Sequence, residues 1–157
     1  MTDASSFEVG EPILSSPFAE PGEHWWIEEG SLPERRPGRR PAGYFYRDPA
    51  ALPAEGDGII RGEWVELELV NLIRERLAAW RGGYPGVTRT TLELLEYWKR
   101  EGRQTPLFFA QLEAAETVIF LTEGRSDLRQ GVEVPPEDGS DLLRYACKMA
   151  TGSGKTT

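Results

Sequence analysis

The middle of the chain carries an apolar stripe with the period of an α-helix. Its members are spaced four, four, four and three positions apart: Val65, Leu69, Ile73, Leu77 and Trp80. This spacing places the five side chains on one face of a helix, and the glycine pair that follows at 82–83 ends it. The sequence therefore predicts a first helix over about 63–81, with Trp80 as a core residue.

Two more helices are expected after the first, over about 90–101 and 105–123. Thr90 and Glu93 have the spacing of a capping box, in which each side chain bonds to the backbone N–H of the other residue. A Thr-Pro pair suits the start of the later helix, because proline is tolerated in the first turn. The sequence therefore predicts a helical region over 61–124.

The segments on either side of the helical region have a different composition. Residues 1–60 hold eight of the twelve prolines, and we expect them to form a long, irregular arm. Residues 125–141 are rich in glycine, proline and acidic residues, which is typical of a surface loop. The run at 142–149 is apolar and is expected to form a strand. The predicted fold is therefore mainly α, with a proline-rich N-terminal arm and a strand near the C-terminus.

Composition excludes several classes of protein. Cys147 is the one cysteine, so no internal disulfide can form, and a single histidine excludes the usual zinc sites. No stretch approaches the ~20 apolar residues of a membrane span, and the N-terminus has neither a basic start nor an apolar run. We therefore expect a protein that is located in the cytoplasm and has no membrane partner.

Charge is unevenly distributed along the arm, within a net charge of −8. Residues 1–30 hold seven acids and no lysine or arginine, whereas residues 31–47 hold five arginines against one acid, Glu34. Aromatic residues at 44–46 lie among these arginines, and basic charge interleaved with stacking surface suits single-stranded nucleic acid. The other interpretation is a solvated loop whose arginines pair with the acidic first 30 residues. The sequence leaves both interpretations open.

The strongest candidate for chemistry is the segment 149–157, which reads MATGSGKTT. Gly152 and Gly154 let the backbone turn with its N–H groups toward a polyphosphate. Lys155 supplies a positive charge for the β and γ phosphates, and Thr156 offers a hydroxyl to Mg²⁺. The expected apolar strand comes directly before the segment, which is the context that a phosphate-binding loop requires. A flexible Gly/Ser-rich tail is the alternative interpretation.

The run Met149–Thr156 resembles motif I of superfamily 2 helicases, and in particular that of the DEAD/DEAH-box-like Res subunits of type III restriction enzymes. A second stretch, Pro106–Thr117, is similar to the adenine-reading Q motif upstream of motif I in those enzymes. Residues 12–18, 24–26 and 38–41 resemble the same family more loosely. The resemblance covers most of the chain, and motif I is its diagnostic part.

The resemblance implies an ATP site made by two separated segments. The residues expected to contact the nucleotide are Phe109, Gln111, Thr151, Gly152, Ser153, Gly154, Lys155 and Thr156. Gln111 would hydrogen-bond the adenine edge, Phe109 or its neighbour Phe108 would pack near the base, and the Thr156 hydroxyl would coordinate Mg²⁺. From the sequence pattern alone, Gln111 is instead a polar residue on the flank of an amphipathic helix, because apolar residues recur beside it at helical spacing.

The same resemblance implies a fold and a function. The chain would be the N-terminal fragment of an ATP-dependent DNA helicase or translocase, in which residues 142–157 begin an α/β RecA-like motor domain. The parent enzyme would bind ATP and Mg²⁺ and act on DNA in a restriction system, with or without an endonuclease activity and with a methyltransferase subunit as partner. The fragment alone is expected to be inactive, because the Walker B acids and the arginine finger belong downstream in such enzymes. Two alternatives stay open: a non-enzymatic module that binds nucleic acid or protein, and another class of P-loop NTPase.

Overall fold

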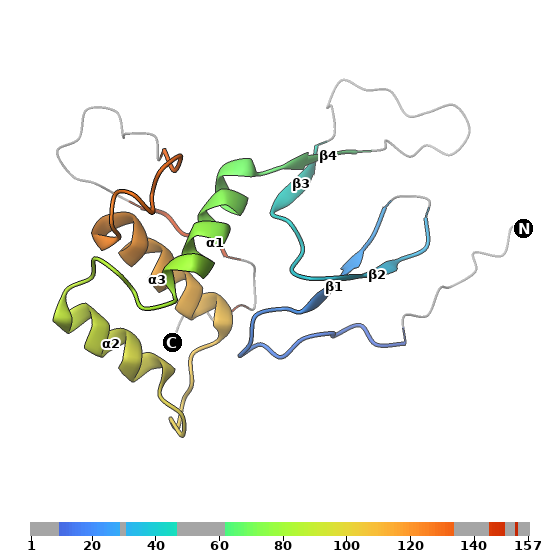
Figure 1. Cartoon of the computed structure of the whole chain (residues 1–157). Coiled ribbons are helices and arrows are strands. Elements are labelled where there is room, and N and C mark those ends of the chain that lie inside the picture. Colours follow the sequence, from blue (N-terminus) through green and yellow to red (C-terminus); the bar gives the residue numbers. More distant parts are fainter. Residues whose placement is uncertain (1–9, 29–30, 47–61, 134–144, 150–152, 154–157) are drawn as a thin grey trace, which may run out of the picture. The chain divides into compact units, whose positions relative to one another are not determined.

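The chain forms two structural units in its computed structural model (Figure 1). The residues that the structure describes are 10–28, 31–46, 62–133, 145–149 and 153. One unit spans Met1–Arg40 and the other spans Pro41–Thr157. The described residues form three helices and two sheets of two strands each.

The first unit is built around an antiparallel hairpin. Strand β1, Glu23–Trp26, pairs with strand β2, Glu34–Pro37. A two-stranded sheet is marginally stable by itself, so contacts between side chains across it matter. The Arg36 guanidinium lies over the Trp26 ring, with Cζ 4.7 Å from the ring centroid, which is a cation–π contact across the hairpin.

The second unit begins with another antiparallel hairpin, in which strand β3, Gly43–Tyr46, pairs with strand β4, Glu63–Glu66. Phe45 lies opposite Trp64, and their ring centroids are 5.1 Å apart in an edge-to-face arrangement. The described part of residues 1–60 therefore contains three short strands within the predicted proline-rich arm. Each of these short strands pairs with a segment separated from it in sequence, which local composition does not reveal.

Helix α1, Glu68–Trp80, follows β4 almost directly and is tied to the hairpin by Asn71. Asn71 Oδ1 accepts a hydrogen bond from the Ala42 N–H at 2.8 Å, and its Nδ2 donates to Glu66 Oε1 at 2.7 Å. The sequence predicted that this helix starts at residue 63. Residues 63–66 lie in β4 instead, because pairing with β3 takes up their backbone hydrogen bonds.

The other two predicted helices are present, with shifted starts. Helix α2 is Arg89–Lys99, and its cap is Thr88, whose Oγ1 accepts from the Thr91 N–H at 3.2 Å, in place of the predicted box at Thr90. Helix α3 is Phe109–Glu123 and begins later than the Thr-Pro pair predicted. The three described helices therefore lie within the predicted region 61–124, and their starts differ from the predicted ones.

The three helices enclose one small hydrophobic core. Its buried apolar members come from α1, the turn after it, α2 and α3: Leu77, Trp80, Tyr84, Leu95, Phe120 and Leu121. Leu77 and Trp80 belong to the predicted apolar stripe and have no exposed surface. Val132 and Tyr145 come from the chain after α3 and pack against the same core. The described part of the segment after α3 therefore folds back onto the helices.

Candidate functional site

The start of α3 carries the two residues predicted to contact adenine, Phe109 and Gln111. Gln111 Oε1 accepts a hydrogen bond from the Phe108 N–H at 2.8 Å and satisfies one of the donors left open at the first turn of a helix. The Arg81 guanidinium lies over the Phe109 ring, with Cζ 5.4 Å from the centroid. Gln111 therefore caps the helix, a role that neither interpretation of the sequence included.

The chain that leads toward the predicted phosphate loop lies against α3. Tyr145 packs on the core, and Cys147 Sγ is 3.9 Å from the carbonyl oxygen of Ala114. Ala114 is in α3, three positions after Gln111. The segment before the loop and the helix that carries Gln111 are therefore in contact.

Most of the predicted loop lies outside the described residues. This applies to Thr151, Gly152, Gly154, Lys155 and Thr156. Ser153 is described and is half-buried. Residues 145–149, the described end of the predicted strand, belong to neither of the two described sheets. The nucleotide and Mg²⁺ roles of the loop therefore stay predictions.

Glu116, in α3, is a carboxylate with no exposed surface. Its Oε2 accepts a hydrogen bond from Arg81 Nε at 2.7 Å, and its Oε1 accepts one from the Tyr84 hydroxyl at 2.5 Å. Lys99 Nζ in turn donates to the Tyr84 hydroxyl oxygen at 2.9 Å. One charged network therefore connects the end of α1, the turn that follows it, α2 and α3.

Burial makes such a network unfavourable unless each member has a partner. Arg81 supplies the opposite charge for Glu116, and its Nη2 lies 3.5 Å from Glu113 Oε1 as well. Burial, together with the hydrogen bond to Glu116, raises the pKa of the Tyr84 phenol well above its usual range. The stability linked to this raised pKa is therefore present below the ordinary tyrosine value of about 10 and is lost as the pH rises through the raised value.

The burial of Glu116 was not predicted from the sequence, although the sequence contains a signal for it. Leu112, Glu116 and Phe120 are spaced four positions apart, so the carboxylate lies in line with apolar residues of one helix face. A charged residue at such a position is rarely fully buried without a partner. Its partner Arg81 lies 35 positions earlier in the chain. A single sequence does not show which of the basic residues pairs with a buried carboxylate.

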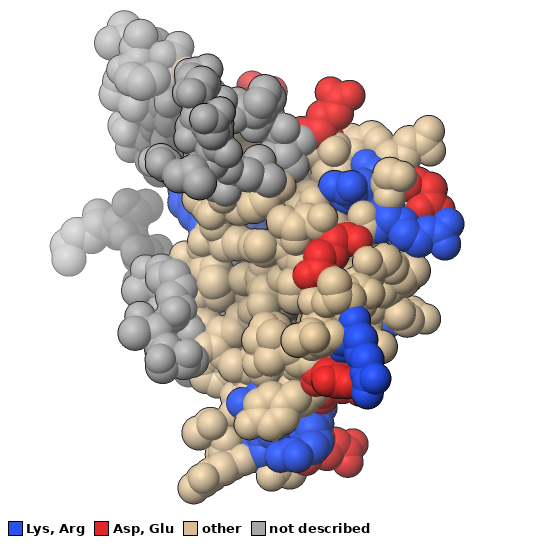
Figure 2. Space-filling model, turned by 90° about the vertical axis from the view of Figure 1, so that its left-hand side faces the viewer, with Lys and Arg blue, Asp and Glu red and all other residues tan. Residues whose placement is uncertain are grey.

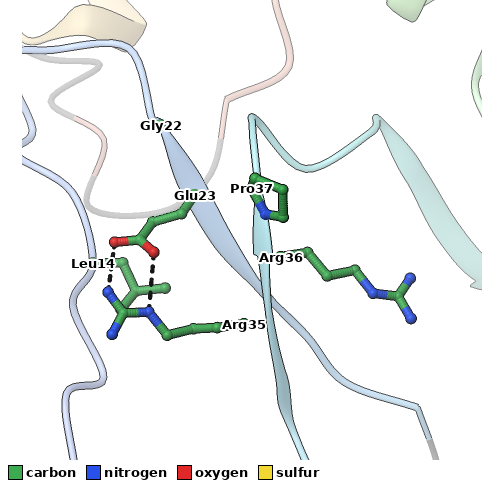
Figure 3. Close-up of a pocket in the computed structure, with 6 residues that line it drawn as sticks. All are labelled: Leu14, Gly22, Glu23, Arg35, Arg36 and Pro37. Carbon is green, nitrogen blue, oxygen red and sulfur yellow. Dashed lines mark hydrogen bonds and ion pairs between the residues drawn. The ribbon is translucent and has the colours of Figure 1, made fainter.

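The hairpin of the first unit contains a shallow hollow of about 430 Å³ (Figure 3). Six residues line it: Leu14, Gly22, Glu23, Arg35, Arg36 and Pro37. Arg35 and Glu23 form a two-bonded ion pair there, with distances of 3.0 Å from Nε to Oε2 and 2.6 Å from Nη2 to Oε1. The Arg36 side chain points away from this pair (Figure 3). The charges of the pair at this hollow therefore neutralise each other.

The arginines of the arm make further ion pairs with acids of the first 30 residues. Arg35 Nη1 lies 3.6 Å from Glu11 Oε2, and Arg39 Nη1 lies 3.9 Å from Glu20 Oε1. Figure 2 shows the face on the left-hand side of Figure 1, where the helices lie, and Lys and Arg side chains lie beside Asp and Glu side chains there as well. The described contacts therefore fit the pairing interpretation of the arm better than that of a free basic surface for nucleic acid.

Metal sites and membrane-spanning helices were sought among the described residues. Within the described ranges, no group of three or more histidine, cysteine or acidic side chains is arranged to hold a metal ion. None of the helices that the structure describes is long and apolar enough to cross a membrane.

Comparisons with known proteins return no match to this chain. No protein-family model matches it, and no curated protein or solved structure does so either. Its function must therefore be argued from its own residues and their contacts.

Proposed function

We propose that this chain supplies the ATP-binding motif of an ATP-dependent DNA helicase or translocase that resembles the Res subunit of type III restriction enzymes. The sequence Gly152-Ser-Gly-Lys-Thr156 is the basis of the proposal. One structural observation supports it: Cys147, five residues before Gly152, contacts Ala114 of α3. The two segments expected to hold the nucleotide, the loop and the helix with Gln111, are thus tied together by the chain between them.

The reach of the chain is compatible with one shared site. Five residues span at most about 18 Å when fully extended, so the first glycine of the loop lies within that distance of Cys147. Ala114 is less than one helical turn from Gln111. In this proposal Lys155 and the loop N–H groups hold the phosphates of ATP, the Thr156 hydroxyl holds Mg²⁺, and Phe109 and Gln111 lie on the adenine side.

DNA is the proposed substrate of the whole protein, and a methyltransferase subunit is its proposed partner. Hydrolysis of ATP also requires a Walker B acid and a residue that positions the attacking water. In this proposal both belong to the motor domain that motif I begins, and ATP hydrolysis is therefore measured on the protein that contains this domain.

The first test replaces Lys155 by alanine and measures DNA-stimulated ATP hydrolysis. We expect kcat/KM to fall about 100-fold, because the ammonium group stabilises charge on the transferred phosphoryl group. Lys148→Ala is the matched control, since this lysine is exposed and lies in the segment just before the loop. Hydrolysis that is equally fast in the Lys155→Ala protein would remove the basis of the proposed function.

A second prediction separates the two roles of Gln111. Gln111→Glu keeps the oxygen that caps α3, so the free energy of unfolding should change by less than about 0.5 kcal/mol. The same variant removes the amide donor, and recognition of adenine needs a donor and an acceptor together, as in amide contacts to adenine in DNA. We therefore expect the preference for ATP over GTP to fall about tenfold.

The control for this variant is Gln104→Glu, which makes the same change of charge at an exposed position before α3. Competition between ATP and GTP in the hydrolysis assay measures the preference. An unchanged preference in Gln111→Glu, with stability also unchanged, would restrict Gln111 to capping the helix.

A further inference from the structure

The C-terminal end of α2 and the turn after it carry three cations, and the exposed acids Glu96 and Glu101 lie beside them in the sequence. Lys99, Arg100 and Arg103 form no ion pair with a carboxylate in the part of the chain that the structure describes. Other exposed arginines of this unit are paired: Arg89 Nε lies 2.9 Å from Glu93 Oε1, and Arg125 forms a two-bonded pair with Asp127. Within the described residues, these three cations are therefore not held in ion pairs, and their N–H groups can donate to an external anion.

An aromatic ring holds two of these cations. Tyr97 is 51% exposed, and the guanidinium carbons of Arg100 and Arg103 lie 5.3 and 5.0 Å from its ring centroid. Arg103 Nη1 also donates to the carbonyl oxygen of Trp98 at 3.2 Å. Among the described residues, both guanidinium groups are thus held by an aromatic ring and not by a carboxylate, so less side-chain entropy is lost when they bind a ligand.

Tyr97, Lys99 and Arg100 border a surface hollow of about 610 Å³, whose lining does not include Arg103 among the described residues. Its lining consists of Tyr84, Glu93, Glu96, Tyr97, Lys99 and Arg100. Lys99 Nζ donates to the Tyr84 hydroxyl and has further N–H groups for a second acceptor. Glu96 repels a small anion inside the hollow, so an isolated phosphate gains little there, whereas a strand with several phosphates can extend to Arg103.

We propose that the end of α2, around Tyr97, Arg100 and Arg103, binds the backbone of single-stranded nucleic acid. A guanidinium group donates two hydrogen bonds to phosphate oxygens, and its plane stacks on an unpaired base. An acidic peptide offers carboxylates but no base to stack on, so a nucleic acid strand fits these residues better. The inference rests on the proposed function in one respect: a helicase separates strands, and a separated strand needs a contact outside the ATP site.

The test is fluorescence anisotropy of the full-length protein with a labelled single strand of about 16 nucleotides, without ATP, over a series of salt concentrations. For Arg100→Gln with Arg103→Gln we expect the affinity to fall about tenfold. The slope of log affinity against log salt should shrink by about 1.4, since each lost phosphate contact on a single strand contributes about 0.7. The matched control is Arg89→Gln with Arg125→Gln, which removes the same charge from paired arginines and should change the affinity less than twofold, or about 0.4 kcal/mol.

Equal affinities for the two double variants would overturn this site, as would displacement of the strand by polyglutamate of matched length. If both double variants melt at the same temperature as the unchanged protein by circular dichroism, a loss of affinity is not caused by unfolding. Failure of this inference is separable from failure of the proposed function, because the strand is expected to bind the Lys155→Ala protein normally. Loss of hydrolysis in Lys155→Ala with no effect of Arg100→Gln and Arg103→Gln rejects this site alone, and the reverse result rejects the ATP motif alone.

Discussion

Replacing Glu116 by alanine is expected to lower the free energy of unfolding of the helical unit by about 3–5 kcal/mol. The carboxylate is fully buried, and its removal takes the 2.7 Å partner from Arg81 and the 2.5 Å acceptor from the Tyr84 hydroxyl. A buried donor without a partner retains its full desolvation cost in the folded state. Urea unfolding followed by circular dichroism measures the change.

Glu113→Ala is the matched control for this prediction. Glu113 lies three positions earlier in α3, and its Oε1 is 3.5 Å from the same guanidinium group, so we expect a loss below about 1 kcal/mol. A double variant, Arg81→Met with Glu116→Leu, removes both charges together and should recover most of the lost stability. Similar losses for Glu113→Ala and Glu116→Ala would contradict the assignment of Glu116 as the centre of the network.

Local sequence pattern was sufficient to predict the three helices and part of the core. The stripe that contains Leu77 and Trp80 is continuous because both residues face the same core, and the glycine pair at 82–83 marks the end of α1. The caps were predicted less well. Thr88 and Thr90 can both cap a helix, because each hydroxyl oxygen can accept from a backbone N–H of the first turn. Which of them is the cap depends on how the preceding turn approaches α2.

Features that depend on distant residues were not predictable from local pattern. Strand β4 was assigned to a helix because Val65 continues the helical spacing, yet its pairing with β3 decides the conformation. Glu116 was not identified for the same reason, since its burial depends on Arg81 and Tyr84. The phosphate loop is the opposite case: its chemistry is readable from the sequence, while most of its residues lie outside those that the structure describes.

The core and the proposed ATP site depend on the same helix. The N-terminal end of α3 carries Gln111, its middle carries Glu116, and its C-terminal half contributes Phe120 to the core. Contacts of Glu116 and Phe120 with the rest of the unit therefore fix the position of Gln111. A variant that weakens the core should lower nucleotide binding only because a smaller fraction of the protein is folded. Gln111→Glu should instead change the preference for ATP over GTP while the folded fraction stays the same.

Trp80→Ala is expected to lower the free energy of unfolding by about 3–5 kcal/mol. The side chain is fully buried, its ring centroid is 4.7 Å from that of Tyr84 and 5.5 Å from that of Phe120, and its Nε1 donates to the Pro85 carbonyl at 3.0 Å. Alanine leaves a cavity between α1 and α3 and leaves the Pro85 carbonyl without this donor. Thermal unfolding measures the loss.

The control is Trp98→Ala, which removes the same side chain from a partly buried position at the border of the core. Its loss should be about half as large, because cavity cost and lost transfer energy both scale with the buried part of the side chain. Trp80→Phe should lie between the two, since it retains most of the contact with Phe120 and loses the hydrogen bond to Pro85. If Trp98→Ala proves the more damaging replacement, the centre of the core lies nearer α2 than the contacts of Trp80 indicate.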